Sequence, residues 1–272
     1  MRLKGKQKVA TYILLVIGAF LVFFPILYAL SISFMGEGEI EARRLIPSTF
    51  TLANYDYVLN ELHLLTYLKN SVIVTIIITA AKLFTSCIAA YAFAFLRFKG
   101  KAVLFSLVIS TMLIPGEVTV LPNFLTVQEL GWINDIKGLT IPFFATAFGI
   151  FLLRQYFLTV PHELWEASRV EGMRHWGFLF KVVIPYCKSG LISLGLFEFI
   201  SSWNMYLWPL LVTNEESART VQIGIKQLQS IEGDTGWGVI MAAVILVILP
   251  ALLLLFFGQK YLQKGLVQGA TK

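Results

Sequence analysis

Residues 161–185 read PHELWEASRVEGMRHWGFLFKVVIP and separate two long apolar runs by a charged segment. Pro161 suits the first turn of a helix, and Glu163 suits the positive end of the helix dipole. Gly172 is able to end such a helix in a left-handed conformation. The pattern predicts a short helix, a sharp turn and a second short helix before Pro185. Such a knob either transmits force to a partner or is a simple surface connection.

The apolar runs on both sides of this segment, and four others, are long enough to cross a bilayer, which takes about 20 residues as a helix. In lipid the backbone must satisfy its own hydrogen bonds, so continuous apolar runs predict helices. We therefore expect an all-α polytopic membrane protein with one transmembrane domain over residues 1–272 and an inner loop at about 161–188. The six expected helices cover about 9–34, 67–96, 102–122, 138–159, 189–212 and 237–259.

The composition supports this fold class. Hydrophobic residues make up 57% of the chain and charged residues 14%, with a mean hydropathy of +0.75. A soluble domain carries about a quarter charged residues. The net charge of +6 does not indicate nucleic acid as a partner, because the basic residues lie between apolar runs rather than along one polar face. The expected environment is membrane lipid.

Lysine and arginine residues predict the orientation, because they concentrate in cytoplasmic loops. With the N-terminus inside, 15 of the 22 basic residues fall in inner segments and six in outer ones. Twelve acidic residues fall outside and three inside. The first run, Val9 to Phe34, exceeds the core of a signal peptide, so an uncleaved helix is expected. The predicted location is the cell inner membrane, with multiple passes and both termini cytoplasmic.

A motif in the inner loop carries a family resemblance. Glu166-Ala167-Ser168, then Gly172, then Ile184-Pro185 resembles the EAA loop of permeases in binding-protein-dependent ABC importers. That pattern is Glu-Ala-Ala, three residues, Gly, eleven residues, an aliphatic residue and Pro. Ser168 stands for the second Ala, Glu171 stands where the sugar branch usually has Asp, and Ser189 stands where Pro is common. The chain resembles the maltose and glycerol-3-phosphate permeases over most of its length, including Asn70-Ser71, Ala90 to Ala94, Ile114-Pro115, Phe151 to Gln155, Trp203-Asn204 and Leu207 to Leu210.

The resemblance implies a type I ABC importer and its partners. A second, homologous permease completes the pore, two ABC ATPases bind ATP and Mg²⁺ beneath it, and an extracytoplasmic solute-binding protein delivers a sugar, an oligosaccharide or sn-glycerol-3-phosphate. The EAA loop is then the coupling helix that contacts an ATPase. The residues implied for that contact are Glu166, Ala167, Ser168, Arg169, Glu171, Gly172 and Met173. No cofactor is expected in this chain, since it lacks a G-x-x-x-x-G-K-[ST] phosphate loop.

Two charged residues fall inside the expected spans, namely Lys82 and Glu198. Charges at membrane depth are costly and rarely face lipid. We expect them to pair with each other or with the partner permease, in a structural role more than in substrate contact.

Candidate residues for the substrate path lie near the fifth span and the outer end of the third. They are Trp203, Asn204, Tyr206, Trp208 and Glu117. Aromatic faces suit the apolar faces of sugars, and an amide suits hydroxyl groups. The alternative is that the aromatic residues form an interfacial belt.

Three other classes remain open from the residues alone. A secondary transporter needs an internal repeat and intramembrane ion ligands, and only Lys82 and Glu198 qualify. A membrane enzyme needs a cluster of catalytic side chains, and none is visible; nor is a metal site expected, since the three histidines are scattered. The third class is the permease of a non-carbohydrate ABC importer.

Overall fold

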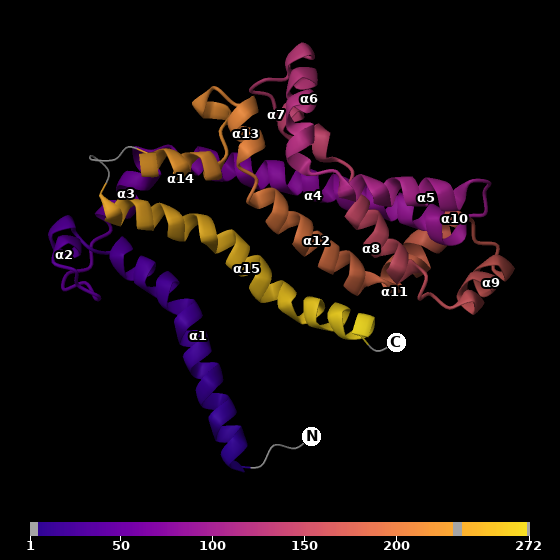
Figure 1. The fold of residues 1–272 in the computed structure, drawn as a ribbon, viewed down its shortest axis with the longest axis horizontal. Helices are drawn as coiled ribbons and strands as arrows, with labels where there is room; N and C mark the ends of the chain where they lie inside the picture. The colour runs from indigo at the N-terminus through magenta and orange to yellow at the C-terminus, as the bar shows by residue number, and fades with distance from the viewer. Residues whose placement is uncertain (1–4, 231–235, 271–272) are drawn as a thin grey trace. The chain divides into compact units, whose positions relative to one another are not determined.

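The computed structural model describes residues 5–230 and 236–270, and within them the chain is built from helices joined by short turns (Figure 1). These residues fall into two compact units. One contains residues up to Leu68 together with Ile223–Pro250, and the other contains Lys69–Gln222 and the chain from Ala251 onward.

Three helices are long and apolar enough to cross a membrane by themselves. They are α1 (Gly5–Ser33), α4 (Leu64–Phe95) and α15 (Trp237–Ala270), with candidate spans Thr11–Ser33, Leu64–Phe95 and Trp237–Gln259. They match three of the six expected runs closely.

The other three expected spans correspond to bent helix pairs rather than to single straight helices. Lys101–Leu113 meets Gly116–Glu129 at 96°, Ile136–Phe143 meets Ala147–Phe157 at 48°, and His175–Tyr186 meets Lys188–Trp203 at 79°. Each pair is apolar enough to count as one span, which gives up to six spans within the described residues. The helices involved are α5 (Lys101–Ser110), η1 (Thr111–Leu113), α6 (Gly116–Glu129), α7 (Ile136–Thr140), η2 (Ile141–Phe143), α8 (Ala147–Phe157), α10 (His175–Phe178), η3 (Leu179–Val183), α11 (Ile184–Tyr186) and α12 (Lys188–Trp203).

Local chemistry explains the first break, which hydropathy does not detect. Ile114 precedes a proline and adopts an extended conformation with ψ of 116°, as proline requires of its predecessor. Pro115 also lacks the N–H that a continuing helix needs. The 79° bend lies just before the fifth expected run, 189–212, and that run itself divides at Asn204, so that α13 (Leu207–Val212) is a separate helix.

The C-terminal end of α4 is held by two cations of the same unit. Lys101 Nζ donates to the carbonyls of Ala94 at 3.3 Å and Leu96 at 2.9 Å, and Arg154 Nε donates to that of Phe93 at 3.2 Å. The last carbonyls of a helix lack partners within it and carry partial negative charge. These contacts therefore fix the end of α4 against α5 and α8.

In the other unit, the residues that follow α1 are folded back on its end. Asn54, in α3 (Ala53–Asn60), donates to the carbonyls of Ser33 at 3.0 Å and Met35 at 2.9 Å. The short helix α2 (Glu37–Glu41) lies between Met35 and Asn54 in the sequence. The helix α14 (Val221–Ser230) precedes α15. The connection between α1 and α4 is therefore an ordered cap rather than an open loop.

Candidate coupling and translocation sites

The predicted knob is present as α9 (His162–Val170), preceded by Pro161 at the N-cap position rather than in the first turn. Gly172 has a φ of +73°, which confirms the predicted left-handed stop. Its N–H donates to the carbonyl of Arg169 at 3.0 Å, and that of Met173 donates to the carbonyl of Ser168 at 2.9 Å. This pair of bonds is the Schellman motif, which satisfies the last carbonyls of a helix.

The face of α9 that packs on the rest of its unit is anchored by aromatic rings. Trp165 stacks on His175 with ring centroids 5.2 Å apart and meets Phe178 edge-on at 4.8 Å. The hydroxyl of Tyr91, on α4, forms a 2.9 Å hydrogen bond with His175 Nδ1. Phe178 is fully buried in the cluster that also contains Leu153. The short helix is therefore attached rigidly to the span α4 through His175.

The opposite face of α9 is exposed, and the Arg169 guanidinium lies 5.6 Å from the Trp165 ring centroid. Glu166 is exposed over 68% of its side chain, and His162 Nδ1 lies 3.2 Å from its carboxylate. Ala167, Arg169 and Glu171 are also exposed. Ser168 is buried with 3% exposure, and its hydroxyl donates to the carbonyl of Trp165. We therefore assign Ser168 to packing of the helix and not to the predicted contact.

Val170 is a feature of this face that the sequence analysis missed. Its apolar side chain is 89% exposed, and it is the last residue of α9. Exposure of an apolar side chain to water is unfavourable. A partner surface that covers Val170 would remove this apolar area from water, which lowers the free energy of the complex. Val170 lies three and four residues after Ala167 and Glu166, so the three exposed side chains share one side of α9.

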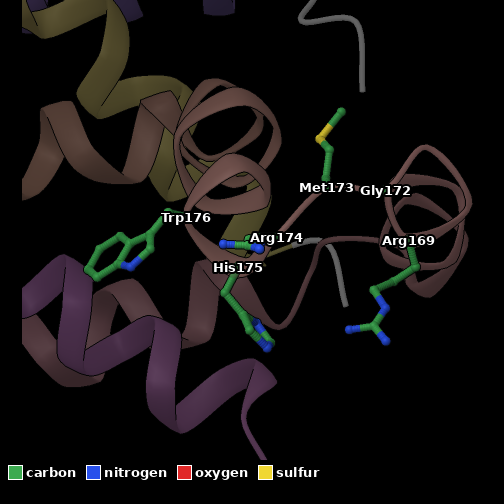
Figure 2. Close-up of a pocket in the computed structure, with 6 residues that line it drawn as sticks. All are labelled: Arg169, Gly172, Met173, Arg174, His175 and Trp176. Atoms are coloured by element: carbon green, nitrogen blue, oxygen red, sulfur yellow. The ribbon is translucent and has the colours of Figure 1, made fainter.

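The turn after α9 contains an open hollow of about 520 Å³. Figure 2 shows its lining, which comes from the end of α9, the turn and the start of α10. The lining residues are Arg169, Gly172, Met173, Arg174, His175 and Trp176. Two arginines at this hollow favour an acidic group on whatever occupies it. In Figure 1, α9 lies away from α6, α7 and α13 of the same unit.

Lys82 and Glu198 meet inside the unit that holds α9. Lys82 Nζ donates to Glu198 Oε2 at 2.7 Å, and the two side chains are 11% and 3% exposed. The bond joins α4 to α12. Of the two expected alternatives, the structure has the one in which these charges pair with each other.

Comparison with known proteins places this arrangement in a family. The family of binding-protein-dependent transport system inner membrane components matches residues 82–268, more than half of the chain. The chain belongs to this family. It is therefore a multi-pass transport component of the inner membrane and not an enzyme.

Its relatives match over nearly their whole length. The sn-glycerol-3-phosphate transport system permease protein UgpE of Rhizobium meliloti (strain 1021) is 34% identical over 94% of this chain and 95% of its own. UgpE of Agrobacterium fabrum (strain C58 / ATCC 33970) is 33% identical over 96% of each chain. A chain in the crystal structure of a bacterial ABC transporter involved in the import of the acidic polysaccharide alginate superposes with a TM-score of 0.86 at 25% identity, covering 96% of this chain and 99% of that one.

The permease does not expose all of the predicted path residues. Trp203 is 2% and Trp208 3% exposed, and Trp208 Nε1 donates to the carbonyl of Gly138 at 3.0 Å. These two rings pack inside the chain, so their faces are not available to a sugar in this structure. Aromatic residues are equally typical of a protein core and of a sugar-binding path, and the sequence alone does not distinguish the two.

Asn204, Tyr206 and Glu117 of the permease are exposed. Asn204 and Tyr206 flank the break between α12 and α13, and Glu117 begins α6 after the break at Pro115. Irregular backbone at membrane depth is tolerated only where protein or a water-filled cavity surrounds it. Three of the five path candidates are thus exposed, at two helix breaks.

Proposed function

We propose that this permease is one of two pore-forming subunits of an ATP-driven importer for a sugar, an oligosaccharide or sn-glycerol-3-phosphate, and that α9 couples it to an ATPase. One observation carries the proposal. A short helix ends in a Schellman motif, is anchored to α4 through Trp165 and His175, and presents Glu166 and the 89% exposed Val170 outward. A rigid helix with one packed and one free face suits the transmission of movement from a partner to a span.

The partners follow from the family and from this surface. A second homologous permease, two ABC ATPases and an extracytoplasmic solute-binding protein complete the importer. ATP and Mg²⁺ belong to the ATPases, and this chain holds no cofactor of its own. None of the most apolar window of Thr11–Ser33 is buried within the chain, which supports a covering of this helix by lipid or by the second permease.

The proposed orientation has both termini and α9 in the cytoplasm. The distribution of basic residues supports it, since 15 of the 22 then lie inside. With this orientation the chain has six spans, three of them bent pairs, and the loops after α6 and α13 face outward. The last basic residue, Lys272, lies outside the described residues.

The solute class rests on the relatives and on the path residues. Two of the relatives are permeases for sn-glycerol-3-phosphate, and one solved relative takes part in the import of a polysaccharide. In this proposal Asn204 and Tyr206 line the path at the α12–α13 break, and Glu117 lines it at the α6 break. An amide and a phenol provide hydrogen bonds to hydroxyl groups, which sugars and glycerol phosphates share.

Transport by the reconstituted complex tests this function. We expect vesicles that contain both permeases and the ATPases to take up labelled sn-glycerol-3-phosphate or a labelled oligosaccharide only when ATP is inside and the binding protein is outside. Each solute is measured alone and with the other in excess. Uptake that is driven by an ion gradient without ATP would instead show a secondary transporter.

A further inference from the structure

The segment between α13 and α14, residues 213–221, has little regular structure of its own, and we call it the outer strap. Its short helical turn, η4 (Glu216–Ala218), is closed by two weak bonds, from Ala218 and Arg219 to the carbonyls of Glu215 and Glu216, both 3.2 Å long. Backbone groups of an irregular segment need partners from elsewhere or from water. In the outer strap most of these partners are side chains of two other parts of the same unit.

The first half of the outer strap is held by a single asparagine. Asn134 Oδ1 accepts hydrogen bonds from the backbone N–H groups of Asn214 at 2.6 Å and Glu215 at 3.1 Å. The backbone N–H of Asn134 donates to the carbonyl of Val212 at 2.9 Å, and its Nδ2 lies 3.3 Å from a carboxylate oxygen of Glu215. Asn134 has a φ of +60°, a conformation in which asparagine is enriched among non-glycine residues. One residue thus holds the end of α13 and the start of the strap.

The second half is held by the start of α4. Asn70 Nδ2 donates to the carbonyls of Ser217 at 2.7 Å and Arg219 at 2.9 Å. Ser71 Oγ accepts from the N–H of Val221 at 2.8 Å, where α14 begins. The two asparagines act through opposite ends of their amides, since Asn134 is mainly an acceptor and Asn70 a donor.

The outward side of the strap is charged and accessible. Glu215 and Glu216 are exposed, and the side chain of Glu216 is 70% exposed with Arg219 Nη1 3.8 Å away. A loop that is fixed before binding loses less conformational entropy when a partner docks on it. The clamp by Asn70 and Asn134 therefore presents these carboxylates in one arrangement.

We propose that Asn134 and Asn70 are positioning residues for docking of the solute-binding protein, because they hold the outer strap in the arrangement that this partner engages. The inference rests on the proposed function, which places the strap outside. It also predicts an asymmetry between the two positions. Asn134→Asp keeps the acceptor and the left-handed backbone, but it replaces the Nδ2 that lies 3.3 Å from Glu215 by a carboxylate oxygen. Asn70→Asp replaces a donor by a carboxylate that faces two carbonyl oxygens.

The test uses the complete importer in vesicles and measures ATPase activity against the concentration of the binding protein. We expect Asn134→Gly, which keeps the backbone conformation but removes both side-chain acceptor contacts, to raise the half-saturating concentration by about tenfold with an unchanged basal rate. Asn70→Asp is expected to act in the same direction. Asn134→Asp is made in a Glu215→Gln background, where no second carboxylate faces it, and is expected to stay within about twofold of Glu215→Gln alone. The matched control is Asn214→Ala, which changes an exposed side chain of the strap but keeps the N–H that Asn134 binds.

A second readout separates a loosened strap from a loss of docking. Hydrogen exchange of the backbone amides of Asn214, Glu215 and Val221 reports the clamp directly. Faster exchange together with a higher half-saturating concentration supports the proposal. Unchanged exchange in Asn134→Gly, or faster exchange with unchanged docking, would overturn it. Absence of any stimulation by a binding protein in the wild type would sink the proposed function itself, before the variants are compared.

Discussion

Replacement of Glu198 by leucine alone is expected to lower the stability of the protein by about 3–5 kcal/mol, because it leaves the ammonium group of Lys82 buried without its partner. The pair is 2.7 Å apart, and its side chains are 11% and 3% exposed. Lys82→Met alone is expected to have a comparable effect, through the unpaired carboxylate. The measurement is thermal unfolding of the detergent-solubilised complex, together with the yield of assembled complex.

The double variant is the decisive comparison. Lys82→Met combined with Glu198→Leu replaces the pair by apolar side chains, and such replacements are often neutral or stabilising. We expect the double variant to regain most of the stability that either single variant loses. If both single variants are as stable as wild type, the pair does not hold α4 to α12. If the double variant is no better than the single ones, the charges have a further role, such as contact with solute.

Gly172→Pro is expected to abolish stimulation of the ATPase while the permease still folds in the membrane. Proline fixes φ near −65°, whereas Gly172 has a φ of +73°, and proline also removes the N–H that donates to Arg169. The change redirects the chain after α9 and displaces the outward face from its anchor at His175. Stimulated ATPase activity and retention of the ATPase during purification measure the effect.

Two neighbouring variants control for this change. Gly172→Asn retains access to the left-handed region and is expected to keep most of the coupling. Gly177→Ala changes a glycine of the same loop where an added Cβ meets only Met173, at 3.8 and 3.9 Å, so it is expected to be silent. If Gly172→Pro couples as well as Gly177→Ala does, α9 is not the coupling element.

The sequence predicted those features that depend on local chemistry or on long apolar runs. The left-handed turn at Gly172 follows from the preference of glycine for that conformation, and α1, α4 and α15 follow from hydropathy. The break at Asn204 was missed, because hydropathy counts apolar residues whether or not the helix continues. Pro115 indicated the break before α6, since proline does not continue a helix.

Burial was the other quantity that the sequence did not predict. Trp203 and Trp208 carry the same chemistry in a core as in a sugar path, and only their contacts show that they are packed. The exposed Val170 and the clamping Asn134 were missed for the same reason, since neither belongs to a pattern that distinguishes them. The dipeptide Asn134-Asp135 is typical of a turn, but this pattern does not indicate which backbone groups the Asn134 side chain binds.

Cross-linking from α9 to the ATPase tests the central claim most directly. Cysteine is placed at position 170 or 215 of the otherwise native chain, where Cys87 and Cys187 are buried and compete little. A short thiol-to-amine cross-linker is then added to the assembled importer. The account predicts an adduct between Val170→Cys and the ATPase and none from Glu215→Cys. An adduct from Glu215→Cys but not from Val170→Cys would reverse the orientation, and no adduct from either would contradict coupling through α9.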